Sequence, residues 1–280
     1  MIQRPPILVA ILMAVVLSAC STPAPSPDSA PSGAPTPASA SEAASALVRA
    51  GAADVAVLKL QLPANQSFQY HAGQYVEFIL RDGARRSYSM ASAPELAQGV
   101  MELHIRHMPG GRFTDHVFGA MKEKEILRME GPFGTFFLRE DSARPVVMLA
   151  SGTGFAPIKA LIEHMEAKGL TRPTVLYWGA RRAADLYLRD WAEAAAARLP
   201  WLRFVPVLSE PEADWSGRTG FVHQAVMADL PDLSGHQVYA CGAPVMVQSA
   251  QRDFVAACGL PEEEFFADAF TSEADKVAGG

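Results

Sequence analysis

Hydrophobic and polar residues alternate in the first part of the chain that is expected to fold, between about residues 48 and 140. The alternation is clearest at residues 58–62 and 101–106, where leucine, methionine and isoleucine are separated by charged or polar residues. A period of two is typical of strands with one buried face. Several short strands with frequent turn signals predict a small antiparallel barrel. Further strands of it are expected at residues 75–80, 85–90, 126–129 and 136–138, with an Asp-Gly hairpin turn at residues 82–83.

Beyond residue 140, solid apolar runs alternate with helical patterns. The run at residues 146–150 predicts a buried parallel strand, and the apolar positions after it recur at helical spacing until Gly169. Alternating strands and helices predict a doubly wound parallel sheet, in which ligands bind at the carboxyl ends of the strands. More strands are expected at residues 174–178, 203–208, 237–241 and 265–266, with helices at residues 185–199 and 222–230 and from residue 244.

A glycine turn joins the first strand of this sheet to its helix. Gly152, Thr153 and Gly154 allow tight dihedral angles and close approach of a ligand to the backbone. Pro157 suits the first position of the helix. The start of a helix attracts anions, so a nucleotide pyrophosphate is the natural occupant of this turn. Pro157 stands where the common dinucleotide-binding fingerprint has its third glycine, which leaves a purely structural turn as the alternative.

Two motifs in the barrel carry similar chemistry. The first contains Arg86, Tyr88 and Ser89, and the second is a glycine turn that leads through Gly111 and Thr114 into a helix ending near residue 121. An arginine fork, the N–H groups of a helix start and a hydroxyl suit a bound pyrophosphate. A tyrosine beside a hydroxyl suits a planar ring. The alternatives are a solvated strand residue for Arg86 and a core aromatic for Tyr88.

Composition narrows the classes of function. Of the 280 residues, 49% are hydrophobic and 19% are charged, which is enough for a large core. The net charge of −6 argues against nucleic acid as a partner, because phosphate binding requires clustered lysine and arginine. The chain's 3 cysteines form no disulfide framework and cannot supply the four thiolates of an iron–sulfur cluster. The histidines show no metal-ligand spacing, so we expect neither a metal site nor an iron–sulfur cluster in this chain.

Five motifs, in the order found here, resemble those of the ferredoxin–NADP reductase superfamily. They lie at residues 86–89, 110–114, 131–134, 151–157 and 241–244. Within the superfamily, the chain is similar to the CDP-6-deoxy-delta-3,4-glucoseen reductase and phenol hydroxylase reductase type over about residues 55–276. The resemblance implies an FAD-binding barrel at residues 47–140 and a nicotinamide-binding α/β domain at residues 141–280. Members of this type usually carry an N-terminal 2Fe–2S domain, for which this chain has no cysteine cluster.

The resemblance also implies an activity. It predicts an FAD-dependent NAD(P)H oxidoreductase that passes hydride from nicotinamide to flavin, and it favours NADH over NADPH. Without an iron–sulfur relay, the electrons are expected to go to a separate acceptor, namely a ferredoxin-like protein, a quinone-like molecule or oxygen. A different class of function is an exported lipoprotein whose reductase-like domain is a non-catalytic binding module.

For the barrel, the resemblance implies a role for each motif residue. Arg86 would hold the FAD pyrophosphate, and Gly111 and Thr114 would bind phosphate. Tyr88 would flank the flavin. Ser89 would lie near flavin N5 as one of two catalytic residues.

For the second domain, the resemblance places Cys241 beside the nicotinamide as the other catalytic residue, next to Gly242. The alternative for Cys241 is a small buried apolar residue. Arg181 follows the second strand, where the adenosine ribose or the extra phosphate of NADP would lie, and its alternative is a solvated turn residue. Asp268 would orient contacts to the flavin ring, and Phe270 would cover the flavin face.

The first 46 residues differ in character from the rest. Arg4 precedes an apolar run at residues 7–17, and the Leu-Ser-Ala-Cys sequence that ends at Cys20 resembles the lipobox of bacterial lipoproteins. Residues 1–20 are therefore signal-like, and residues 21–46, rich in alanine, proline and serine, predict a disordered linker. A lipidated Cys20 would anchor the protein to a membrane. Because NADH and FAD are cytosolic, we expect instead a cytoplasmic enzyme in which residues 1–46 are dispensable or a misassigned start.

Overall fold

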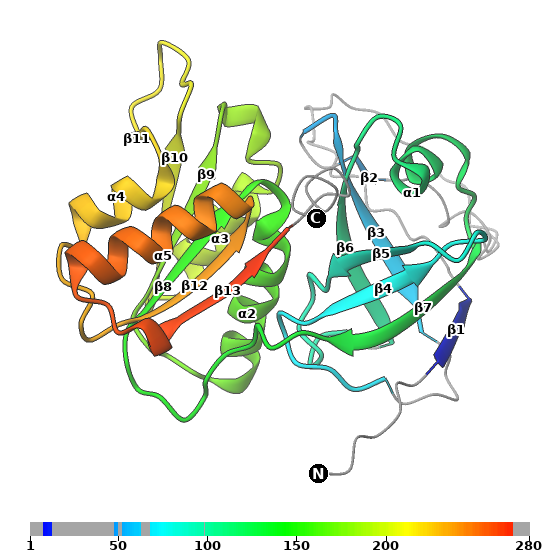
Figure 1. Cartoon of the computed structure of the whole chain (residues 1–280), viewed down its shortest axis with the longest axis horizontal. Coiled ribbons are helices and arrows are strands. Elements are labelled where there is room, and N and C mark those ends of the chain that lie inside the picture. Colours follow the sequence, from blue (N-terminus) through cyan, green and yellow to red (C-terminus); the bar gives the residue numbers. More distant parts are fainter. Residues whose placement is uncertain (1–7, 13–47, 50–51, 63–67, 98, 271–280) are drawn as a thin grey trace, which may run out of the picture.

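The computed structural model describes residues 8–12, 48–49, 52–62, 68–97 and 99–270. In this part of the chain, an antiparallel barrel and a parallel-sheet domain lie side by side (Figure 1). The predicted order of a barrel followed by a doubly wound domain is confirmed. Most of residues 1–46 lie outside the described ranges, so the signal-like segment and the linker stay predictions. Within residues 1–46, the structure describes β1 (Leu8–Leu12), which pairs antiparallel with β7 (Ile126–Phe133).

Two antiparallel sheets make up the barrel in the described residues. One has the strand order β1-β7-β4-β5 and the other β2-β3-β6. A bridge between Met90 and Leu103 joins the two sheets. Leu58 and Leu60 are fully buried in the barrel core, as their alternation with polar residues predicts. The other strands are β2 (Val48–Arg49), β3 (Val55–Gln61), β4 (Tyr75–Ile79), β5 (Arg85–Ser89) and β6 (Val100–Arg106).

A short helix follows the second barrel motif. Helix α1 (Arg112–Asp115) continues directly into a π-helical stretch, η1 (His116–Ala120), so the helical segment ends where the sequence predicts. Phe113 and Val117 are buried against the barrel core. This packing holds the start of α1, and the glycine turn before it, at one edge of the barrel.

The second domain is a six-stranded parallel sheet within the described residues. Its order is β11-β10-β9-β8-β12-β13, and each neighbouring pair is parallel. The first strand of this domain, β8, lies in the middle of the sheet. The chain adds β9, β10 and β11 on one side of β8 and then returns to add β12 and β13 on the other, so the strand order reverses between β8 and β12. Such a switch point opens a crevice at the carboxyl ends of the strands. The strands are β8 (Val146–Ser151), β9 (Thr174–Ala180), β10 (Leu202–Leu208), β11 (Arg218–Thr219), β12 (Gln237–Gly242) and β13 (Phe265–Ala269).

Helices cover both faces of this sheet. Two of them, α2 (Phe155–Lys168) and α3 (Arg189–Arg198), pack on the face whose core also includes barrel residues. The other face is covered by α4 (Val222–Asp229) and α5 (Pro244–Cys258). The core on the first face is therefore continuous with the barrel. Gly169 ends α2 in the left-handed conformation, as predicted.

The connection between the domains differs from the sequence-based prediction. Residues 136–138 do not form the predicted strand. Phe136 and Leu138 are buried there against the second domain, and the N–H of Arg139 donates to the hydroxyl of Tyr239 at 2.9 Å. The apolar pattern therefore serves the contact between the domains.

Two helix starts also differ from prediction. Helix α2 begins at Phe155, so Pro157 is its third residue and not its first. Proline is tolerated there because the first four N–H groups of a helix have no intrahelical partner. Helix α3 begins at Arg189, because residues 183–185 form a separate 3₁₀ turn. Across the described ranges, every helix is too short or too polar to cross a bilayer.

Candidate cofactor cleft

A cleft of about 1550 Å³ lies between the barrel and the carboxyl edge of the parallel sheet. The barrel contributes β5, the end of β6 and the glycine turn before α1. The second domain contributes the turn after β8, the end of β9 and the segments at the ends of β12 and β13. Sites for one small molecule typically measure about 300–1,000 Å³, so this cleft has room for more than one ligand.

The residues predicted from the motifs fall into two groups around this cleft. The residues that line it are Arg86, Tyr88, Ser89, Gly111, Thr114, Gly152, Thr153, Arg181 and Phe270. The residues that lie beside lining residues without forming its surface are Gly154, Pro157, Cys241 and Gly242. The first group is positioned to touch a ligand, and the second to shape the turns around it.

Aromatic side chains form one wall of the cleft. The ring centre of Tyr88 lies 5.9 Å from that of Phe78 and 5.2 Å from that of Phe113. Phe113 also lines the cleft, and it stacks at 4.8 Å on Phe78, which is buried and does not line the cleft. Burial raises the pKa of the Tyr88 hydroxyl, so the phenol stays protonated. A rigid and uncharged aromatic wall suits a planar ring system.

Ser89 and Asp268 meet across the two domains. The hydroxyl of Ser89 donates to a carboxylate oxygen of Asp268 at 3.3 Å. Burial raises the pKa of Asp268, and the hydrogen bond from Ser89 offsets part of that rise. Asp268 lies opposite Cys241 in the register of β13 and β12. Ser89 and Asp268 both line the cleft, and Cys241 lies beside Asp268 in the sheet without reaching the cleft surface.

The glycine turn of the barrel is built on close contacts. Gly110 has a φ of +82°, which favours glycine. A Cβ on Gly111 would lie 2.6 Å from the hydroxyl oxygen of Thr114 and would displace that side chain. Thr114 donates to the carbonyl of Met108 at 2.9 Å and so closes the turn, while its contact with phosphate stays a prediction. The turn presents the start of α1 to the cleft, where N–H groups that lack intrahelical partners suit an anion.

Arginine side chains bring positive charge to the cleft. Arg86 donates to the carbonyl of the preceding residue at 2.7 Å. Arg112, next to the glycine turn, pairs with Asp82. Arg181 follows β9, and its Nε lies 3.9 Å from a carboxylate oxygen of Asp185. All three residues line the cleft, and the guanidinium fork is well matched to phosphate.

The glycine turn after β8 is locked to the end of β12. A Cβ on Gly154 would lie 2.2 Å from the carbonyl oxygen of Cys241, so a side chain here would push the two segments apart. Gly242 has a φ of +137°, and a Cβ there would lie 2.3 Å from the hydroxyl oxygen of Ser151. That hydroxyl accepts a hydrogen bond from the N–H of Ala243 at 3.0 Å. The two turns that flank the switch point therefore form one unit.

Cys241 is fully buried and does not form part of the cleft surface. Burial raises the pKa of its thiol well above the ordinary value, and the nearby carboxylate of Asp268 adds to the rise. The side chain is therefore a neutral thiol in a tightly packed position. Its place beside a nicotinamide stays a prediction.

Large apolar side chains are exposed around the cleft. Met108, Phe221 and Val245 are 53%, 62% and 71% exposed, and all three line it. Exposed apolar side chains gathered around a concavity mark a surface that binds a ligand or a partner. Single apolar residues next to turns give no periodic signal, so these residues are not predictable from the sequence.

Comparison with known proteins agrees with this geometry. The family profile described as "Oxidoreductase FAD-binding domain" matches residues 49–138, and the one described as "Oxidoreductase NAD-binding domain" matches residues 148–252. The NAD(P)H-flavin reductase of Vibrio harveyi is 33% identical over 205 residues, which cover 72% of this chain and 86% of that protein. The chain belongs to the ferredoxin–NADP reductase superfamily. The resemblance drawn from the five motifs is thereby confirmed.

Two other members of the superfamily are similar over most of the chain. The CDP-6-deoxy-L-threo-D-glycero-4-hexulose-3-dehydrase reductase of Yersinia pestis is 46% identical over 217 residues, which cover 78% of this chain and 64% of that protein. The chain thus spans 64% of that relative's length. The structure of the Amycolatopsis cytochrome P450 reductase GcoB matches with a TM-score of 0.76 and 29% identity, covering 97% of this chain and 72% of that one. The barrel is therefore an FAD-binding domain and the parallel sheet an NAD-binding domain, as predicted.

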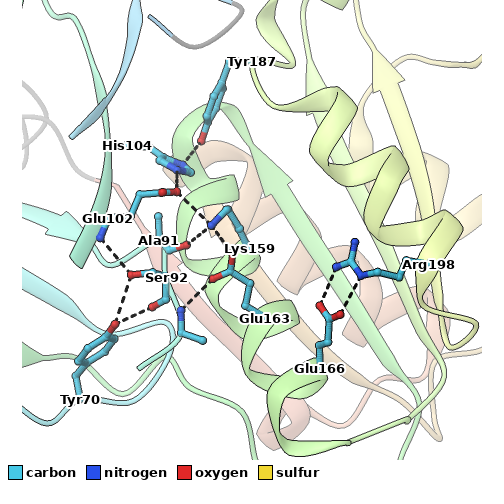
Figure 2. A network of polar contacts seen from close by, with 11 residues as sticks. Tyr70, Ala91, Ser92, Glu102, His104, Lys159, Glu163, Glu166, Tyr187 and Arg198 are labelled. Atoms are coloured by element: carbon cyan, nitrogen blue, oxygen red, sulfur yellow. Dashed lines mark hydrogen bonds and ion pairs between the residues drawn. The ribbon is translucent and has the colours of Figure 1, made fainter. Parts of the chain in front are cut away.

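The two domains of this superfamily member meet through a buried polar network (Figure 2). Lys159 of α2 lies 3.1 Å from Glu102 of β6 and 2.6 Å from Glu163, and it donates to the carbonyl of Ala91 at 3.0 Å. The Glu102 carboxylate also lies 3.0 Å from Nε2 of His104. This network is not predictable from the sequence, because polar residues that alternate with apolar ones in a strand normally face solvent. The face of β6 that carries them faces the second domain instead.

Replacing Glu102 with glutamine is expected to lower stability in a pH-dependent way. Burial alone would raise the pKa of Glu102, but the hydrogen bonds from His104 and Lys159 and the charge of Lys159 outweigh it and lower the pKa to about 2. A folded-state pKa below the unfolded one gives stability that is present above about pH 4.5 and is lost as the pH falls toward 2. We therefore expect Glu102→Gln to cost roughly 1–3 kcal/mol at neutral pH and progressively less in acid. Thermal unfolding of both proteins across this range measures the effect, and a difference independent of pH would contradict it.

Proposed function

We propose that the chain is an FAD-dependent NAD(P)H oxidoreductase that transfers hydride from a nicotinamide to a flavin. The observation that carries the proposal is one cleft onto which two glycine turns open, one from the FAD-binding barrel and one from the NAD-binding domain. Its volume of about 1550 Å³ exceeds the usual range for one small ligand. A cleft of this kind suits two cofactors that must exchange a hydride.

Residues of the barrel, at 47–140, would hold FAD. Arg86 and the start of α1 after Gly111 would bind the pyrophosphate, because a guanidinium fork and the N–H groups at the start of a helix both favour phosphate. Thr114 would keep the turn in shape through its bond to the Met108 carbonyl. Tyr88 and Phe270 would bound the ring from the barrel and from the end of β13, and both line the cleft.

Residues of the second domain, at 141–280, would hold the nicotinamide dinucleotide. Gly152 and Thr153 line the cleft at the switch point, where they would meet its pyrophosphate. When bound, the two cofactors supply the hydride chemistry. The chain itself would align them: Ser89 is held by Asp268 at 3.3 Å, and the backbone of Cys241 packs against Gly154 in the turn.

The preferred nucleotide in this proposal is NADH. Arg181 and Asp185 both line the cleft after β9, where the adenosine ribose of a dinucleotide is expected. The Asp185 carboxylate accepts a hydrogen bond from the N–H of Arg182 at 3.1 Å, so it is held in place. A fixed carboxylate suits the 2′-hydroxyl of NADH and repels the 2′-phosphate of NADPH.

The electrons would leave for a separate acceptor. The Yersinia relative is named as the reductase of a dehydrase, which supports a separate partner for this chain as well. The acceptor we propose is a ferredoxin-like protein or a small molecule. We propose the cytoplasm as the place of action, because it supplies NADH and FAD.

Replacing Ser89 or Cys241 with alanine is expected to slow flavin reduction by NADH about tenfold while FAD stays bound. The first change removes the hydrogen bond to Asp268, and the second removes a fully buried thiol from the end of β12, where the backbone packs against Gly154. Either change would misplace one ring against the other by a fraction of an ångström. Rapid-mixing measurements on FAD-loaded variants check this, and reduction at the wild-type rate in both would refute the assigned roles.

Nucleotide consumption tests the proposed function as a whole. The full chain is loaded with FAD and assayed with NADH or NADPH, using ferricyanide as a one-electron acceptor. We expect NADH to be oxidised with the higher kcat/KM. FAD-loaded protein that consumes neither nucleotide would overturn the proposal.

A further inference from the structure

Three polar residues on one face of β6 reach into the NAD-binding domain. Glu102, His104 and Arg106 alternate along the strand, and each lies close to that domain. Glu102 lies 3.1 Å from Lys159. Nδ1 of His104 lies 2.7 Å from the hydroxyl of Tyr187, and Nη2 of Arg106 lies 3.7 Å from where a Cβ on Gly152 would be. The central contact, between His104 and Tyr187, is the one with both side chains buried.

The direction of the hydrogen bond between His104 and Tyr187 follows from the neighbouring carboxylate. Glu102 is ionised and can only accept, so Nε2 of His104 carries a proton toward it at 3.0 Å. Burial lowers the pKa of His104 and therefore favours the neutral ring, although the neighbouring Glu102 carboxylate acts in the opposite direction. In that form Nδ1 is an acceptor, and the O–H of Tyr187 donates to it. The hydroxyl of Tyr187 thus has a fixed partner in the other domain (Figure 2).

Two further aromatic side chains connect Tyr187 to the glycine turn that faces the cleft. Its ring packs edge-on against Trp178, with ring centres 5.2 Å apart and planes at 88°. Trp178 stacks on Phe155, the first residue of α2, at 3.8 Å. The indole Nε1–H of Trp178 donates to the carbonyl of Gly152 at 3.2 Å. A continuous series of contacts therefore joins β6 of the barrel to the turn at residues 152–154.

We propose that His104 and Tyr187 are positioning residues, whose hydrogen bond sets the place of the turn at residues 152–154 relative to the FAD-binding barrel. This inference rests on the proposed function, because the turn matters for hydride transfer only if a nicotinamide dinucleotide binds there. Hydride transfer is steeply sensitive to the distance between donor and acceptor. The two side chains would act on the rate through the turn: Tyr187 does not line the cleft, and His104 borders it with a side chain that is fully buried.

The test compares two tyrosines of the same domain. Tyr187→Phe removes only the hydroxyl that reaches His104. Tyr177→Phe is the matched control, because Tyr177 is equally buried and its hydroxyl donates to Asp229 at 3.1 Å, on the side of the sheet away from the barrel. His104→Asn is the conservative variant at the other partner, since its amide oxygen can take the place of Nδ1 as acceptor.

Hydrogen–deuterium exchange on the cofactor-free full chain gives the first readout. We expect the amides of residues 152–155 to exchange at least about threefold faster in Tyr187→Phe than in the wild type. They should be unchanged in Tyr177→Phe. Unchanged exchange at the turn in Tyr187→Phe overturns the coupling, whether or not the chain proves to be an oxidoreductase.

Rapid mixing of the FAD-loaded proteins with saturating NADH gives the second readout. We expect Tyr187→Phe to reduce the limiting rate of flavin reduction at least about fivefold at equal FAD content, with His104→Asn and Tyr177→Phe within about twofold of the wild type. A wild-type limiting rate in Tyr187→Phe overturns the positioning role. A wild-type protein that binds FAD and is not reduced by NADH overturns the proposed function, and with it any role of this pair in hydride transfer.

Discussion

Replacing Arg86 with alanine is expected to leave the purified protein largely without FAD. Arg86 lines the cleft next to the aromatic wall, and a guanidinium beside a pyrophosphate makes charge-assisted hydrogen bonds. Losing such a bond costs about 1.5–3 kcal/mol, so we expect the affinity for FAD to fall roughly 10- to 100-fold. Flavin absorbance per protein after gel filtration, and titration of the stripped protein with FAD, measure the change.

A matched control for this variant is Arg252→Ala. Arg252 lies on α5 away from the cleft, with a side chain that is 70% exposed and paired with the neighbouring Asp253. The Arg252→Ala substitution also removes one arginine charge from the chain, and FAD content should stay at the wild-type level. Full FAD content in Arg86→Ala would mean that the barrel motif does not hold the pyrophosphate.

Replacing Gly154 with alanine is expected to abolish binding of the nicotinamide nucleotide. The new methyl carbon would lie 2.2 Å from the carbonyl oxygen of Cys241 and 2.7 Å from the Cα of Gly242, and both are backbone atoms. The turn after β8 must therefore move away from the end of β12. Overpacking of this kind typically costs about 1–3 kcal/mol of stability, and here it also displaces the turn that faces the ligand.

Gly235→Ala provides the comparison for this change. An added Cβ at Gly235 meets nothing within 4 Å, so the same substitution there introduces no clash. We expect Gly154→Ala to lower the melting temperature and to raise the KM for NADH beyond the measurable range, while Gly235→Ala changes neither. If both variants bind NADH equally well, the packing of the two turns does not control the site.

Much of the fold is predictable because the two sheets leave different traces in the sequence. The strands β3 and β6 bury one face in the barrel core, so leucine and methionine alternate with polar residues. The strand β8 is covered by helices on both faces, and its sequence is a solid apolar run. The connection between the domains at residues 136–138 has the same local sequence pattern as a strand. Only its packing against the second domain distinguishes it from one.

The candidate site is predictable where glycine and arginine carry the chemistry. At Gly111, Gly154 and Gly242 a Cβ would collide with neighbouring atoms of the chain. These positions therefore require glycine, and glycine is visible in the sequence. Contacts between distant elements leave no such trace. His104 and Tyr187 lie 83 positions apart in the sequence. The alternation of polar and apolar residues in β6 does not indicate that its polar face contacts another domain.

The most direct test of the central claim is anaerobic rapid mixing of the FAD-loaded full chain with NADH while the visible absorbance of the flavin is followed. The account predicts that the absorbance disappears in a fast phase, with NADH oxidised in an amount equal to the bound FAD. Bound flavin that stays oxidised in the presence of excess NADH and of excess NADPH would contradict it.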